Sequence, residues 1–287
     1  MTKSYKELSY RSADGLTLYA RDYNPGNVSD TILCMHGLTR NSADFHDLAI
    51  NLCDRFRVIS VDQRGRGRSD YDTEASNYRP DVYCADMFTL VDHLGLERPI
   101  AIGTSMGGIM IMLMSALRPG VFKAAILNDI GPEIDPKGLE RIKNYVGEAR
   151  PFPNWQAATM AVRKIGAIAF PEYSDNDWIA FAKRTCEQRD DGLIHFSYDP
   201  AISAPIKDEP EAAAPADMWP LFATLGDVPI LIVRGGTSDI LSVETLEKMG
   251  AQHPNCQKVT VPGIGHAPML DEPEARKAIE TFLSTIQ

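Results

Sequence analysis

The 287-residue sequence is poor in the features that define several protein classes. Its cysteines are few, widely spaced and odd in number, and no two form a CxxC pair, which predicts free thiols rather than a disulfide framework or a zinc site. These cysteines are Cys34, Cys53, Cys84, Cys186 and Cys256. No apolar run comes near the roughly 20 residues that span a bilayer, and residues 1–15 contain no apolar segment of signal-peptide type. We therefore expect a cytoplasmic protein that has no membrane partner.

Basic residues are scarce as well. The 29 lysines and arginines are outnumbered by 39 aspartates and glutamates, which gives a formal net charge of −10. A nucleic-acid partner is therefore not expected, because phosphate backbones bind basic surfaces. The sequence also contains no HxxxH pair or carboxylate cluster that would suggest a metal site, so we expect neither a metal nor another cofactor. The 44% of hydrophobic residues is typical of a globular protein.

Short apolar runs alternate with longer segments of helical spacing over most of the chain. Continuous apolar strands separated by helices are typical of a parallel sheet that is covered on both faces. The predicted strands are residues 31–35, 57–61, 100–102, 124–127, 229–233 and 258–261, and the predicted helices are residues 43–53, 80–94, 105–117, 243–251 and 273–286. Before them, Ala13-Asp-Gly15 between two extended segments predicts a β-hairpin.

The alternation stops over residues 132–220. This stretch is rich in aromatic residues and has helical periodicity, but it contains no convincing strand. We predict a mainly helical insertion that lies over the sheet as a cap. The α/β core is then formed by residues 1–131 and 221–287.

One motif carries chemistry. Gly103-Thr-Ser-Met-Gly-Gly108 follows a predicted strand and precedes a predicted helix, which is the G-x-S-x-G pattern of a nucleophile elbow. A serine in this turn lies at the end of a sheet and at a helix N-terminus, where developing negative charge is favoured. The same serine could instead only cap the helix. We predict that Ser105 is a nucleophile.

A serine hydroxyl needs a base to take its proton and an acid to hold that base. His266 follows the last predicted strand, which places it at the same sheet edge as Ser105. Two acids also follow predicted strands at this edge, Asp129 and Asp239. The chain order Ser, Asp, His favours Asp239 as the acid. Asp129 is expected to shape the exit into the insertion or to line the substrate pocket.

The oxyanion formed by such an attack needs amide donors. The N–H of Met106 is one candidate, and the loop His36-Gly-Leu38 after the first parallel strand can supply the second through Leu38. Gly37 could equally be only a turn residue. We expect His36 to brace this loop. Arg40 follows directly and could attract a substrate carboxylate, or it could be a solvated surface charge.

Five motifs in this order resemble the α/β-hydrolase fold family: Met35-His-Gly-Leu38, Asp62-Gln-Arg-Gly-Arg-Gly-Arg-Ser69, Gly103–Gly108, Arg234-Gly-Gly-Thr-Ser-Asp239 and Gly263-Ile-Gly-His266. The resemblance extends from about residue 15 to the end, and the insertion matches in location only. It implies an α/β-hydrolase fold with a mostly parallel eight-stranded sheet, flanking helices and a cap. It also implies that Leu38 is an oxyanion donor and that Asp62, Arg64 and Ser69 are scaffold residues.

The expected activity is hydrolysis of a small, largely apolar ester or lactone through an acyl-enzyme. The Ser-Met-Gly-Gly run is also similar to the meta-cleavage C–C bond hydrolases. Those enzymes typically have Asn before the serine and Trp after the histidine, where this chain has Thr104 and Ala267. Other acyl chemistry and a non-catalytic ligand receptor are further alternatives. The sequence leaves the substrate and the oligomeric state open.

Overall fold

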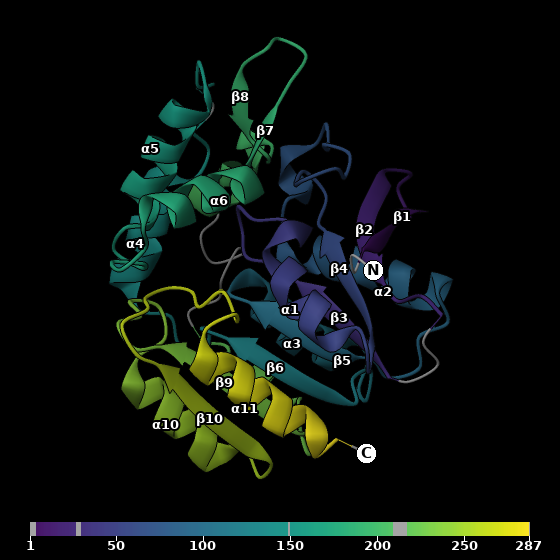
Figure 1. The fold of residues 1–287 in the computed structure, drawn as a ribbon. Helices are drawn as coiled ribbons and strands as arrows, with labels where there is room; N and C mark the ends of the chain where they lie inside the picture. The colour runs from purple at the N-terminus through teal and green to yellow at the C-terminus, as the bar shows by residue number, and fades with distance from the viewer. Residues whose placement is uncertain (1–3, 27–29, 149, 209–216, 287) are drawn as a thin grey trace.

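The computed structural model describes residues 4–26, 30–148, 150–208 and 217–286. An eight-stranded sheet forms its centre, in the order β1-β2-β4-β3-β5-β6-β9-β10 (Figure 1). The hairpin strands β1 and β2 are antiparallel to their neighbours, and the other strands pair in parallel. The strands are β1 (Tyr5–Arg11), β2 (Thr17–Tyr23), β3 (Thr31–Met35), β4 (Arg57–Asp62), β5 (Ile100–Thr104), β6 (Ala124–Asn128), β9 (Ile230–Gly235) and β10 (Cys256–Val261). Each strand that the sequence predicts is present.

In the described part of the chain, five helices flank the sheet: α1 (His46–Leu52), α2 (Pro80–His93), α3 (Met106–Leu117), α10 (Val243–Gln252) and α11 (Pro273–Ser284). Alternate residues of a strand point to opposite faces. Leu33 and Met35 of β3 accordingly pack in the cluster that contains α2, α3 and α10, whereas Ile32 and Cys34 pack with α1 and α11. Burial on both faces explains why β3 is apolar at every position from Ile32 to Met35.

Most of the predicted insertion lies between β6 and β9 as a group of elements on one side of the sheet (Figure 1). Its longer helices are α4 (Pro136–Tyr145), α5 (Trp155–Gly166) and α6 (Asp175–Thr185), followed by the short helices α7 (Ala204–Asp208) and α9 (Trp219–Ala223). The expectation that it holds no strand is wrong, because β7 (Cys186–Gln188) and β8 (Ile194–Phe196) form a two-stranded antiparallel sheet. These strands are too short to give a period-two signal in the sequence. Residues 209–216 of the predicted insertion lie outside the described residues.

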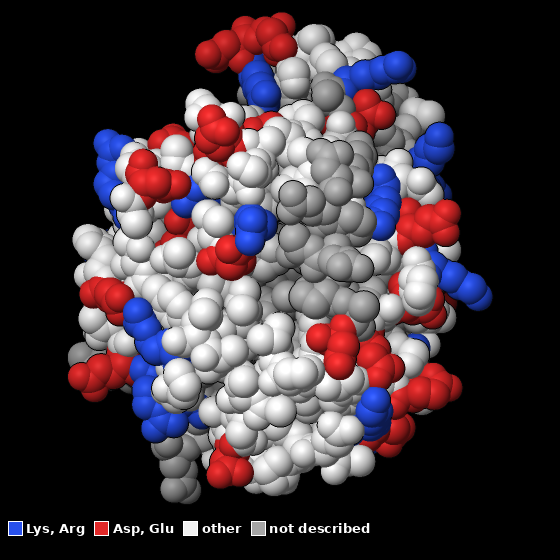
Figure 2. Space-filling model, turned by 180° about the vertical axis from the view of Figure 1, so that it is seen from behind, with Lys and Arg blue, Asp and Glu red and all other residues white. Residues whose placement is uncertain are grey.

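The surface and the thiols agree with the composition. On the face shown in Figure 2, acidic and basic side chains lie interspersed around a mostly uncharged area. The five cysteines form no disulfide with one another, and four of them are buried. Among the residues that the structure describes, no helix combines the length and the apolar character needed to cross a bilayer.

Candidate active site

The turn between β5 and α3 holds Ser105 in a backbone conformation that residues other than glycine rarely adopt, with φ 52° and ψ −113°. The glycines around it permit close backbone contacts. A Cβ on Gly103 would lie 2.4 Å from the carbonyl carbon of Gly107, and a Cβ on Gly107 would lie 2.1 Å from the carbonyl oxygen of Met35. The elbow is therefore packed against the end of β3, and its sequence pattern follows from that contact.

His266 faces Ser105 from the loop that follows β10. Its Nε2 lies 2.9 Å from Ser105 Oγ, and only 8% of its side chain is exposed. The loop is fixed by the insertion, because the amide of Gly265 donates to the carbonyl of Ala169 at 2.7 Å. It is also fixed by the core, because Asn128 Nδ2 donates to the carbonyl of Pro268 at 2.8 Å.

The carboxylate that faces His266 belongs to Asp129, at the end of β6. Asp129 Oδ2 lies 2.9 Å from His266 Nδ1 and accepts from Ser238 Oγ at 2.7 Å, while Oδ1 accepts from the amide of Gly235 at 2.8 Å. The side chain is fully buried. An ionised carboxylate only accepts hydrogen bonds, so it places the imidazole proton on Nδ1 and leaves Nε2 free to accept from the serine hydroxyl.

Asp239 is engaged elsewhere, which corrects the prediction that it holds the histidine. Arg141 of α4 donates to both of its carboxylate oxygens, at 2.5 and 2.7 Å. Burial alone would raise the pKa of Asp239, but the hydrogen bonds and charge of Arg141 outweigh it and lower that pKa. The alternative that Asp129 lines the substrate pocket is wrong, since Asp129 lines neither of the pockets beside Ser105.

The loop after β3 lies against the serine. A Cβ on Gly37 would lie 3.7 Å from Ser105 Cβ. His36 Nδ1 lies 2.7 Å from the carbonyl oxygen of Gly37, and its Nε2 accepts from the amide of Gln63 at 3.0 Å. Because a carbonyl only accepts, the ring proton is on Nδ1. The Gly37 carbonyl and the Leu38 N–H share one trans peptide, so this hydrogen bond directs the Leu38 N–H away from His36.

These contacts confirm the prediction that His36 braces the loop. The ring is completely buried, and burial lowers the pKa of His36 to about 3. The next peptide of the loop is held as well, because Arg66 Nε donates to the carbonyl of Leu38 at 2.9 Å. Arg66 is itself buried and bonded to the hydroxyl of Tyr83 at 2.9 Å. Arg66 belongs to the Asp62–Ser69 motif, but no feature of the sequence predicts these contacts.

The other residues of that motif form a scaffold. Asp62 accepts from the amides of Ser42 and Arg68, and Ser69 Oγ donates to the carbonyl of Asp62 at 2.6 Å. Arg64, 2% exposed, bonds three carboxylates, those of Asp14, Asp72 and Asp86. These contacts tie the loop to the turn between β1 and β2 through Asp14 and to α2 through Asp86.

Ser105 lies between two pockets. One, which we name the His266 pocket, has an empty volume of about 1020 Å³, part of it open to solvent, and its lining includes His266, Arg40, Arg141, Phe170, Phe181 and Thr185. The other, which we name the Met106 pocket, has an empty volume of about 680 Å³, also partly open to solvent, and its lining includes Met106, Ile109, Ile130, Leu139, Ile206 and Ile240. Ser105 and Leu38 line both.

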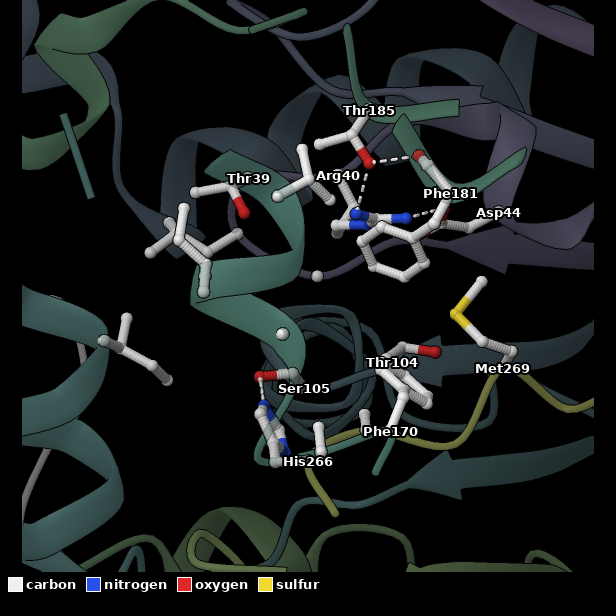
Figure 3. A pocket seen from close by; sticks show the side chains of 18 of the residues that line it. Thr39, Arg40, Asp44, Thr104, Ser105, Phe170, Phe181, Thr185, His266 and Met269 are labelled. Carbon is white, nitrogen blue, oxygen red and sulfur yellow. Dashed lines mark hydrogen bonds and ion pairs between the residues drawn. The ribbon is translucent and has the colours of Figure 1, made fainter. Parts of the chain in front are cut away.

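Arg40 lies inside the His266 pocket and not on open surface. Figure 3 shows Arg40, Phe181 and Thr185 across the pocket from Ser105 and His266. The guanidinium lies 4.1 Å from the centre of the Phe181 ring, donates to both oxygens of Asp44, and donates to Thr185 Oγ1 at 2.6 Å. Only 15% of the Arg40 side chain is exposed.

Comparison with known proteins agrees with this architecture. The chain belongs to the alpha/beta hydrolase fold family, whose model matches residues 30–273. It is 36% identical over 250 residues to a 3-hydroxybutyrate-oligomer hydrolase of Cupriavidus necator, covering 84% of each chain. It is 29% identical over 270 residues to a 2-(acetamidomethylene)succinate hydrolase of Mesorhizobium japonicum, covering 93% of this chain and 92% of the relative. The crystal structure of an alpha/beta hydrolase from Novosphingobium aromaticivorans superimposes with a TM-score of 0.93 at 43% identity, covering 99% of both chains.

Proposed function

We propose that this hydrolase cleaves a carboxylic ester or a lactone by attack of Ser105. The observation that carries the proposal is the hydrogen-bonded series Ser105 Oγ, His266 Nε2, His266 Nδ1 and Asp129 Oδ2, in which both contacts measure 2.9 Å. The relative from Cupriavidus necator is named for 3-hydroxybutyrate oligomers. Oligomers of a hydroxy acid are joined by ester bonds, so the name supports ester hydrolysis.

In the first half-reaction, Ser105 Oγ forms a bond to the carbonyl carbon while its proton passes to His266 Nε2. The carbonyl electron pair moves to oxygen, and the amides of Leu38 and Met106 donate to this oxyanion. The pair returns, the bond to the alkoxy oxygen breaks, and His266 gives its proton to the departing alcohol. Asp129 stabilises the imidazolium while it exists.

In the second half-reaction, a water molecule attacks the acyl-enzyme from the place that the alcohol has left. His266 Nε2 takes a proton from this water and returns it to Ser105 Oγ, so the acid is released and the serine is restored. In this proposal Asp129 takes the role that the sequence analysis gave to Asp239. The apolar side chains around the serine support a largely apolar substrate of small or medium size.

The proposal is tested by labelling with a fluorophosphonate and by hydrolysis of p-nitrophenyl butanoate. Both should be lost in Ser105→Ala, by several orders of magnitude in kcat/KM. Ser284→Ala, at the end of α11, is the matched control and should behave as the wild type. Labelling without ester turnover would direct attention to C–C bond or amide substrates. Absence of labelling would favour a ligand receptor and would contradict the proposal.

A further inference from the structure

We propose that the two pockets fix the direction in which an ester binds, with an apolar acyl chain in the Met106 pocket and a carboxylate-bearing alcohol in the His266 pocket. This inference rests on the ester hydrolysis proposed above and names its substrate class. The acyl half and the alcohol half of an ester differ in the chemistry that each requires from the enzyme. The side chains around Ser105 are distributed accordingly.

The direction follows from the position of the proton donor. The departing alkoxy oxygen receives its proton from His266 Nε2, so the alcohol must lie on the side of His266. His266 lines one of the two pockets, and Met106, whose amide is the proposed oxyanion donor, lines the other. A carbonyl whose oxygen lies at the Leu38 and Met106 amides therefore directs its acyl chain into the Met106 pocket.

The Met106 pocket suits an acyl chain without polar groups. Aliphatic side chains dominate its wall, among them Ile109, Ile130, Ile134, Leu139, Ile206 and Ile240. A polar acyl group would lose its hydration here and gain few partners. Among the described residues that line it, Lys143 is the single charged side chain, and it is half-buried on α4.

The His266 pocket offers donors for an anion. A guanidinium has five N–H groups. Asp44 and Thr185 accept three of those on Arg40, which leaves two, and Asp239 accepts two of those on Arg141, which leaves three. Each arginine is already paired with an aspartate, so the pocket recognises a carboxylate by hydrogen bonds at short range and not by a large positive field.

A pair of reversed esters tests the direction in the wild-type protein. The two isomers are 3-(butanoyloxy)propanoate, with the carboxylate on the alcohol, and monopropyl succinate, with the carboxylate on the acyl chain. They differ only in the order of the carbonyl and the bridging oxygen. We expect kcat/KM to be roughly tenfold to hundredfold higher for 3-(butanoyloxy)propanoate, which is the range for hydrogen bonds to a charged group.

Substitutions locate the discrimination. In Arg40→Met and in Arg141→Met the ratio of kcat/KM between the two isomers should fall toward one. The double variant Arg40→Met/Asp44→Asn repeats the test without leaving the Asp44 carboxylate unpaired. Each ratio is measured within one variant, so partial loss of folded protein cancels. Arg163→Met is the control of equal charge, because Arg163 lies on α5 with Val162 and Ile165 of the pocket wall but is itself exposed.

Equal rates for the two isomers in the wild type would overturn the inference. So would a preference for monopropyl succinate, above all one that is lost in Lys143→Met. Propyl butanoate, which has the same skeleton without the carboxylate, separates this failure from failure of the proposed function. If it is hydrolysed while the isomers are not distinguished, only the direction is wrong. If none of the three esters is hydrolysed, ester hydrolysis itself is contradicted.

Discussion

Ser238 Oγ donates to the same oxygen of Asp129 that faces His266 Nδ1. The hydroxyl oxygen of Ser238 in turn accepts from the amides of Ile240 and Leu241, at 3.2 Å each. Its proton is therefore directed at the carboxylate. The β9–α10 loop thus contributes a positioning residue to the site, although its own aspartate, Asp239, is bonded to Arg141.

Ser238→Ala should lower kcat/KM without abolishing activity. The variant removes one of three hydrogen bonds to a buried carboxylate, and a bond to a charged group contributes about 1.5–3 kcal/mol. We expect kcat/KM for p-nitrophenyl butanoate to fall roughly tenfold to hundredfold. Ser238→Thr keeps the hydroxyl and should restore most of the activity. Equal activity of Ser238→Ala and the wild type would show that Gly235 alone positions Asp129.

The two aspartates should respond in opposite ways to the same substitution. Asp129→Asn should reduce kcat roughly ten-thousandfold, because an amide at this position cannot hold the neutral imidazole with its proton on Nδ1. Asp239→Asn should change kcat by less than about tenfold and should destabilise the fold by at most about 1 kcal/mol, since its ion pair is partly exposed. Burst-corrected kinetics and urea unfolding measure both effects. A larger loss of kcat in Asp239→Asn would return the acid role to that residue.

His36 should affect turnover through the oxyanion loop. In His36→Gln the carbonyl of Gly37 loses its ring donor, so the Leu38 amide is less well fixed. We expect kcat to fall roughly tenfold to a few hundredfold with a small change in KM, because an oxyanion donor acts mainly in the transition state. An unchanged kcat would mean that the amide of Arg40, which donates to the same carbonyl at 3.1 Å, is sufficient.

The same variant should change the response of stability to acid. The pKa of His36 is 6.5 when unperturbed and about 3 in the fold. Between these values the unfolded chain binds a proton that the folded chain does not, so the free energy of unfolding decreases as pH falls from 6.5 toward 3. The slope is about 1.4 kcal/mol per pH unit. His36→Gln should lose this contribution. Urea unfolding of both proteins across that window measures the difference, and parallel curves would contradict it.

Gly107→Ala should prevent formation of the elbow. The new Cβ would meet the carbonyl oxygen of Met35 at 2.1 Å, and neither atom can rotate away, because the oxygen is a backbone atom and the backbone fixes the position of the Cβ. We expect a loss of about 3 kcal/mol or more in the free energy of unfolding, or no folded protein. Gly26→Ala is the control, because a Cβ there meets nothing within 4 Å. A folded and active Gly107→Ala protein would show that β3 can shift.

The strands, the elbow and the position of His266 could be predicted because each depends on local sequence. Apolar runs gave the parallel strands, and position after a strand placed Ser105 and His266 at one edge. The acid could not be decided in this way, since Asp129 and Asp239 both follow strands that end at that edge. What distinguishes the two aspartates is their tertiary contacts. Ser238 and Gly235 bind one carboxylate, and Arg141, from a helix of the insertion, binds the other.

The contacts of the pocket residues could not be predicted from the sequence, for a related reason. Arg40 directly follows the His36–Thr39 loop in the chain, but its place in the wall of the His266 pocket depends on contacts with Phe181 and Thr185. Thr185 lies 145 residues later in the sequence. Arg66 looks like one more residue of a basic loop until Leu38 and Tyr83 are seen around it. Such contacts join segments that are distant in the chain, and the periodicity of apolar residues in the sequence does not predict them.

The hydrogen bond from the Gly265 amide to the Ala169 carbonyl ties the residue that precedes His266 to the insertion. Any outward movement of the connection between α5 and α6 must either break this bond or carry the His266 loop with it. The position of the insertion and the position of the His266 loop are therefore coupled. The deuterium exchange rate of the Gly265 amide would measure how often this hydrogen bond opens and releases the His266 loop from the insertion.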